Sequence, residues 1–153
     1  MNRTADLRSR SLIRITLISL LTLAFLSITA AEANSPTAGK QKMVIQVSDN
    51  SPGKWNLALN NARNAQNALG GADNVDVEIV VYGPGIGMLE MDSETGNRVA
   101  NALDQGVKIV ACENTMRARD LTKGDMLPDI GYVPAGVIEI MKQQQQGYTY
   151  IRP

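Results

Sequence analysis

Short apolar runs alternate with segments of helical spacing over most of this chain, and this alternation constrains the fold more than any other feature. Runs typical of buried strands lie at residues 43–47, 75–82 and 107–112. The second half of 75–82 is continuously apolar, as expected of a strand covered on both faces. Strands joined by helices need right-handed crossovers, which give a mainly parallel sheet between two helical layers. The sequence therefore predicts an α/β fold.

Turn residues and periodicity set the bounds of the remaining elements. Ser51-Pro52 suits the start of a helix and Gly70-Gly71 its end, and Gly106 and Gly147 end two later helices. We expect helices at residues 52–69, 93–105, 113–121 and 135–146, a loop at 122–129, and short strands at 130–133 and 148–151.

The N-terminal segment has the three parts of a secretory signal peptide. Four arginines precede the apolar stretch 15–28, and the small-x-small site Ala31-Glu32-Ala33 follows it. The apolar stretch is short and interrupted by Ser and Thr compared with the ~20 residues that span a membrane. We expect a signal peptide at 1–33 with cleavage between Ala33 and Asn34, and an exported, periplasmic protein; an uncleaved membrane anchor is the alternative.

What remains after cleavage is a flexible lead-in at 34–41 and one α/β domain at 42–153. Removal of residues 1–33 takes away four arginines, Asp6 and Glu32, which leaves 11 basic and 13 acidic residues and a formal charge of −2. The chain has no basic patch with interleaved aromatic residues. Neither nucleic acid nor, after cleavage, a membrane is an expected partner.

The only cysteine, Cys112, ends the apolar run 107–112 and is followed at once by a predicted helix. Ligands of open α/β sheets bind outside the carboxyl ends of the strands, so this is a position where chemistry takes place. The chain has no histidine, which excludes a Cys-His dyad, a Ser-His-Asp triad and any histidine metal site. A lone cysteine cannot form an internal disulfide, so this thiol is either buried or reactive.

The residues around Cys112 are compatible with a reactive thiol and with a buried one. Alternation places Val110 and Cys112 on one face of the strand and Ile109 and Ala111 on the other. Basic side chains nearby would lower the pKa of the thiol, and the neighbouring Glu113 would raise it. The basic residues are Arg117, Arg119 and Lys123. Free cysteine is also among the most buried residue types, which favours an inert core thiol.

Glycine is concentrated in one loop, where Gly83, Gly85 and Gly87 follow the strand at 75–82. The G-x-G-x-x-G spacing of dinucleotide sites is not met, and Pro84 removes one backbone donor. We interpret the loop as a turn or a pocket wall rather than a phosphate cradle. No metal-ligand spacing is present and no cofactor is expected; the acidic residues of the later turns, Asp120, Asp125 and Asp129, are interpreted as solvated.

At these residues the chain resembles the DsrE/DsrF-like family, from about residue 42 to Pro153. The resemblance implies a three-layer α/β/α fold with a mainly parallel five-stranded sheet, and association into oligomers. In the sulfur-relay members a single cysteine at this strand end carries sulfur as a persulfide between donor and acceptor proteins, and Cys112 matches that position. The stretches that carry the resemblance are 43–48, 80–86, 110–116 and 129–136.

Three functional hypotheses follow. The first is a periplasmic sulfur-handling protein, a homo-oligomer in which Cys112 accepts sulfane sulfur from a donor protein and passes it to an acceptor. The second is a non-enzymatic oligomeric binding or assembly module with a buried, inert cysteine, and the third is a redox protein that forms a mixed disulfide with a partner. For the first, the expected pocket and supporting residues are Gly83, Gly85, Gly87, Glu113, Asn114, Arg117 and Lys123.

Overall fold

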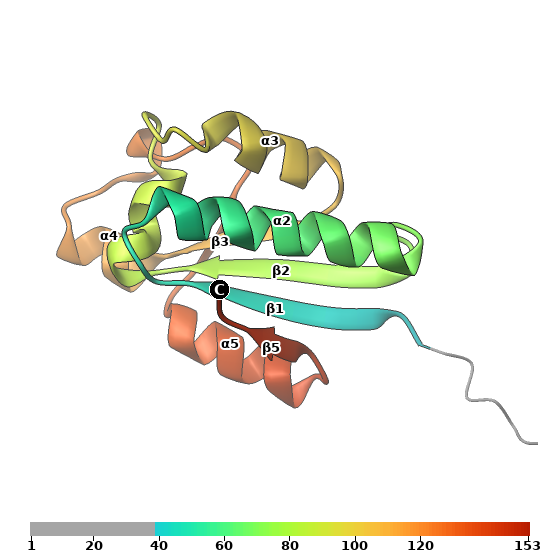
Figure 1. Ribbon diagram of the computed structural model, residues 1–153. Helices are drawn as coiled ribbons and strands as arrows, with labels where there is room; N and C mark the ends of the chain where they lie inside the picture. The colour runs from blue at the N-terminus through green and yellow to red at the C-terminus, as the bar shows by residue number, and fades with distance from the viewer. Residues whose placement is uncertain (1–38) are drawn as a thin grey trace, which may run out of the picture. The chain divides into compact units, whose positions relative to one another are not determined.

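A computed structural model describes residues 39–153, so the expected signal peptide, the expected cleavage site and most of the expected lead-in lie outside the described residues. Five strands form one sheet in the order β4-β3-β2-β1-β5, and every neighbouring pair is parallel. This confirms the predicted α/β fold with a five-stranded sheet (Figure 1). The strands are β1 (Gln41–Val47), β2 (Val75–Val81), β3 (Lys108–Cys112), β4 (Gly131–Val133) and β5 (Thr149–Ile151).

The helices that connect the strands are α2 (Pro52–Leu69), α3 (Gly96–Asp104), α4 (Glu113–Ala118) and α5 (Gly136–Gln145). Two short 3₁₀ helices are added, η1 (Gly83–Leu89) and η2 (Lys123–Asp125). The prediction of a helix over 52–69 is confirmed: proline occupies the first turn of α2, and Gly70 ends the helix in the left-handed region at φ 86°.

Two of the predicted helices are shorter in the structure. The helix expected to reach residue 121 ends at Ala118, because Asp120 takes a left-handed φ of 55° and the Leu121 N–H closes back on the carbonyl of Met116. The helix expected from residue 93 starts at Gly96, because a turn closed by the N–H of Ser93 on the carbonyl of Glu90 precedes it.

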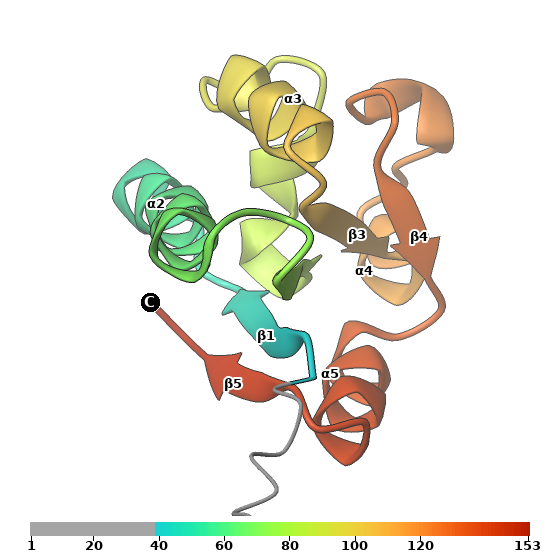
Figure 2. The ribbon, with the colours of Figure 1, turned by 90° about the vertical axis from the view of Figure 1, so that its right-hand side faces the viewer.

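The two faces of the sheet are covered unequally, as Figure 2 shows: α2 and α3 lie on one side and α5 on the other. The side of α2 and α3 holds the larger core, to which Ile45, Ile79, Ile109 and Ala111 contribute from the strands. The side of α5 holds a smaller cluster. The three-layer prediction is therefore confirmed: α2 packs against β1 and β2 from one side, and α5 packs against β1, β2 and β5 from the other.

The smaller cluster fixes which strand residues face α5. Its buried members are Val44, Val80, Ile140 and Tyr148, with Tyr82 and Val110 packed against them. Because side chains alternate along a strand, Cys112 shares the face of Val110 and points to the side of α5. This confirms the predicted division of the 107–112 strand. Within residues 39–153, none of the helices has the length and apolar character needed to cross a membrane.

The glycine-rich segment differs from the turn expected at 83–87. It forms η1, whose residues Ile86, Met88 and Leu89 are completely buried in the larger core. Only glycine fits at position 85, because a Cβ there would lie 2.7 Å from the carbonyl oxygen of Val47. The segment therefore joins the core rather than forming an open loop.

Candidate functional site around Cys112

Cys112 is both the last residue of β3 and the residue that caps the N-terminus of α4. Its backbone is extended, with φ −77° and ψ 112°, so the strand continues until the helix begins. The register pairs Val81 with Ala111, which places Tyr82 beside Cys112 on the α5 side. The thiol is 5% exposed. The site thus lies at the carboxyl edge of the sheet, below the start of α5.

Four polar groups near the thiol sulfur lower its pKa. Burial is the largest single influence on the pKa of Cys112 and raises it. Hydrogen bonds from the backbone of Gly136, from the hydroxyl and backbone of Thr115 and from the backbone of Asn114 lower it, and together they outweigh burial. The pKa of the thiol therefore lies below its ordinary value of 9.0. The arrangement favours a thiolate, the reactive form of cysteine.

Thr115 connects the thiol to the segment that follows β2. Its hydroxyl oxygen accepts a hydrogen bond from the backbone N–H of Gly83 at 2.9 Å. The same Thr115 side chain is among the groups that lower the pKa of Cys112. Gly83 adopts φ 55°, a left-handed conformation that suits glycine. Gly83 thus supports the site through its backbone.

The start of α5 is held against the site by close packing. A Cβ on Gly136 would lie 3.0 to 3.2 Å from side-chain atoms of Tyr82, so only glycine lets the helix approach this closely. The N–H of Asn114 also donates to the carbonyl of Pro134 at 3.2 Å, which ties α4 to the segment before α5. These contacts fix the backbone of Gly136 over the sulfur.

Tyr82 is close enough to both the thiol and the end of the chain after β5 for their groups to influence its pKa. Burial raises the pKa of Tyr82, as do Tyr150 and Cys112, whereas Arg152 lowers it. Tyr150 is 38% exposed and donates to the side-chain oxygen of Gln46 at 2.6 Å. The side chains beyond Tyr82 are therefore polar, and a cation is among them.

The charged residues expected to support the thiol make other contacts. Arg117 is exposed and donates to the side-chain oxygen of Asn114. The ammonium of Lys123 lies 4.5 Å from the centre of the Tyr132 ring. Because Tyr132 pairs with Ala111, its ring is on the face of the sheet opposite the thiol. Neither these cations nor the carboxylate of Glu113 is among the groups that shift the pKa of Cys112.

The three glycines expected to line a pocket have different roles. Gly83 contacts Thr115, as described, whereas Gly85 packs on the backbone of Val47 and a Cβ on Gly87 would lie 3.4 Å from the Trp55 ring. Gly85 and Gly87 therefore allow η1 to pack into the core. Among the described residues, no group of three or more His, Cys, Asp or Glu side chains is placed to hold a metal ion.

Of the residues that lower the pKa of the thiol, the sequence analysis named Asn114 but missed Thr115 and Gly136, and it also missed the neighbouring Tyr82. Thr115 carried a local signal, because it lies in the first helical turn after Cys112, where a hydroxyl can reach back to a residue three positions earlier. Gly136 carried none, since its place above the sulfur depends on how the α5 layer packs on Tyr82. Neutral hydrogen-bond donors, and not the predicted cations, therefore lower the pKa of the thiol.

Comparison with known proteins gives a family and a fold. The model of the DsrE/DsrF-like family matches residues 41–153. A solved protein of unknown function from Methanobacterium thermoautotrophicum is 32% identical, with a TM-score of 0.70 over 74% of this chain and 100% of its own. A conserved protein of unknown function from Bacteroides thetaiotaomicron shares the fold, at 15% identity and a TM-score of 0.61 over 74% of this chain and 95% of its own. No curated protein matches the chain.

Proposed function

Because the chain belongs to the DsrE/DsrF-like family, we propose that it carries sulfane sulfur as a persulfide on Cys112. The observation that carries this proposal is the set of hydrogen bonds from Gly136, Thr115 and Asn114 that lower the pKa of the thiol. A thiolate is the nucleophile in sulfur exchange, and these donors stabilise it without histidine. The family suggests a role related to sulfur relay, and the chemistry of the site is compatible with it.

The proposed reaction consists of two exchanges that need no oxidant. In the first, the Cys112 thiolate attacks the outer sulfur of a donor persulfide; a new S–S bond forms at Sγ, the donor S–S bond breaks, and the donor leaves as a thiolate. In the second, an acceptor thiolate attacks the outer sulfur on Cys112, which regenerates the Cys112 thiolate. The donors around Sγ stabilise that leaving group, so they assist the second exchange as well.

We further propose that the protein works in the periplasm as a homo-oligomer. The N-terminal sequence supports export, with Ala33 as the last residue removed. Support for the oligomer comes from α5, where three apolar residues are exposed to solvent: Val137 is 56% exposed, Ile138 43% and Met141 48%. Val137 and Ile138 follow Gly136 directly, so a second copy seated on this face would lie beside the start of α5 and the thiol.

One observation favours a second candidate function, the binding or assembly module with an inert cysteine. Cys112 is only 5% exposed, and a sulfur covered to this extent is typical of a packed core residue. The two functions differ in how the native thiol reacts with a small alkylating reagent. A carrier is labelled in buffer at a rate that follows the thiolate fraction, whereas an inert thiol is labelled only after denaturant is added.

Loading with sulfur tests the proposed function. The purified protein is incubated with polysulfide, and peptide mapping by mass spectrometry locates any added sulfur. The proposal expects one added sulfur atom on the peptide that contains Cys112, removed by a reductant and absent from Cys112→Ser. No adduct in the wild type, or one that persists in Cys112→Ser, would overturn the proposal.

A further inference from the structure

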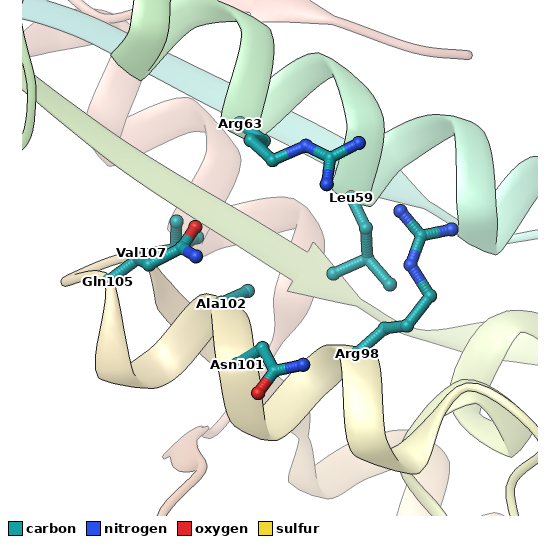
Figure 3. Close-up of a pocket in the computed structure, with 7 residues that line it drawn as sticks. All are labelled: Leu59, Arg63, Arg98, Asn101, Ala102, Gln105 and Val107. Carbon is teal, nitrogen blue, oxygen red and sulfur yellow. The ribbon is translucent and has the colours of Figure 1, made fainter.

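A hollow of 120 Å³ lies between α2 and α3, on the face of the sheet opposite Cys112. Figure 3 shows Arg63 reaching into it from α2 and Arg98 from α3. We propose that this hollow binds a small tetrahedral oxyanion of the sulfate or phosphate class, held by the two guanidinium groups. The inference is independent of the chemistry proposed for the thiol.

The positive charge of the hollow is not neutralised by the protein. The ion pairs among the described residues involve Lys40, Lys54, Arg119 and Arg152, but neither arginine of the hollow. The α2 helix contains no Asp or Glu at all. Two guanidinium groups that face one space without a carboxylate repel each other, and a bound anion would remove that repulsion.

Arg98 is held in place by neutral oxygens. Its guanidinium donates to the side-chain oxygen of Asn56 and, at 2.7 Å, to that of Asn60. These bonds fix the orientation of the planar group but leave its charge uncompensated and some of its five N–H donors free. A guanidinium that is already ordered loses little side-chain entropy when it binds an oxyanion.

The shape and lining of the hollow limit the ligand. Leu59, Ala102 and Val107 form its apolar part, and amide side chains are contributed by Asn101 and Gln105. Sites for drug-sized ligands have volumes of about 300–1,000 Å³, so this hollow is too small for a nucleotide and suits one oxyanion. The amides can donate to the anion oxygens that the arginines leave free.

Calorimetric titration of the purified protein with sulfate, thiosulfate or phosphate tests the proposal. The ionic strength is kept constant with chloride as the background salt. We expect saturable binding of at least one of the three, and the order of their affinities identifies which oxyanion the site prefers. Arg63→Gln should weaken binding by about tenfold or more, since it removes a charged hydrogen-bond donor. Arg98→Lys should weaken it as well, because an ammonium lacks the fork of donors.

Lys142→Gln is the matched control, since it removes a positive charge from an exposed position on α5 and should leave the affinity unchanged. The Arg63 side chain is exposed and has no hydrogen bond or ion pair within the described residues, so its variant should keep the fold and the test remains decisive even if Arg98 variants unfold. The proposal is wrong if none of the three anions binds saturably, or if Arg63→Gln and Lys142→Gln bind as the wild type does. A general effect of salt on the protein would appear as a heat signal that does not saturate and is equal in all variants.

Discussion

The hydroxyl of Thr115 accepts a hydrogen bond from the backbone N–H of Gly83 at 2.9 Å, and the same side chain lowers the pKa of the Cys112 thiol. One side chain thus joins the segment after β2 to the thiol at the end of β3. The bond from Gly83 orients the hydroxyl, and the oriented hydroxyl stabilises the thiolate more than the thiol. This relation explains how a chain without histidine lowers the pKa of its cysteine.

Thr115→Val tests this relation, since valine has nearly the shape of threonine without the hydroxyl. Loss of the donor should raise the pKa of Cys112 toward 9.0, the ordinary value. The pH dependence of alkylation by a small reagent measures the midpoint. Thr115→Ser keeps the hydroxyl and is the matched control, expected to retain a low midpoint. Equal midpoints in wild type and Thr115→Val would show that the hydroxyl does not stabilise the thiolate.

Gly85 should be intolerant of any side chain. In Gly85→Ala the new Cβ would lie 2.7 Å from the carbonyl oxygen of Val47, so the backbone must shift, at a cost of about 1–3 kcal/mol in the free energy of unfolding. Gly53→Ala is the control, because its nearest neighbour atom is 3.9 Å away and alanine favours the helix by up to about 1 kcal/mol. Urea denaturation should rank Gly53→Ala at or above wild type and Gly85→Ala well below; the reverse order would contradict this packing.

Glu78 should make stability fall with rising pH. Burial raises the pKa of Glu78 above 4.5, the charge of Glu139 adds to this, and Lys108 opposes it. The folded state therefore binds this proton more tightly than the unfolded state, so the stabilising contribution is present below 4.5 and is lost as the pH rises through the folded pKa.

In Glu78→Gln this loss should disappear, while a side-chain oxygen remains to accept from Gln143, which donates to Glu78 at 2.8 Å. The quantity to compare is the free energy of unfolding of the variant minus that of the wild type. We expect this difference to be more favourable to the variant at pH 7 than below pH 4.5. Urea denaturation at several pH values measures this difference. A difference that does not change with pH would show that the carboxyl has the same pKa in both states.

The exposed face of α5 should govern self-association. If the homo-oligomer forms there, Ile138→Glu places a charge in an apolar contact and should shift the protein to the monomer in analytical ultracentrifugation. Gln144→Glu, at an exposed position on the same helix outside the apolar set, is the control and should leave the assembly unchanged. A wild-type protein that is monomeric, or an Ile138→Glu oligomer of unchanged size, would contradict the proposed interface.

How far the sequence predicts this protein depends on whether a feature is local. Alternation along 107–112 separates Ile109 and Ala111 from Cys112, because strand geometry is local and regular, but only the structure shows that Ile109 and Ala111 face the larger core. The 3₁₀ helix over Gly83–Leu89 could not be predicted, since glycine and proline indicate a turn and the close approach of Gly85 to Val47 depends on the neighbouring strand.

The full set of groups that shift the pKa of Cys112 could not be predicted for the same reason, because tertiary packing rather than local sequence brings them together. Nearness in sequence suggested that Lys123 supports the thiol, but the chain turns between α4 and β4 and its ammonium lies over Tyr132. Gly136 is more than twenty residues from Cys112 in sequence, yet its backbone lowers the pKa of the thiol. The packing of α5 on the sheet creates that contact, and no pattern within either segment encodes it.

The complete transfer of sulfur tests the central claim most directly. The protein is loaded with polysulfide, freed of the donor and mixed with a small acceptor thiol, and the intact masses of both are followed. Transfer by Cys112 predicts that the protein first gains one sulfur atom and then returns to its starting mass as the acceptor becomes a persulfide, with neither change in Cys112→Ser. A native wild-type protein that gains no sulfur, although its thiol is labelled after denaturant is added, would contradict the claim and identify Cys112 as a packed, inert residue.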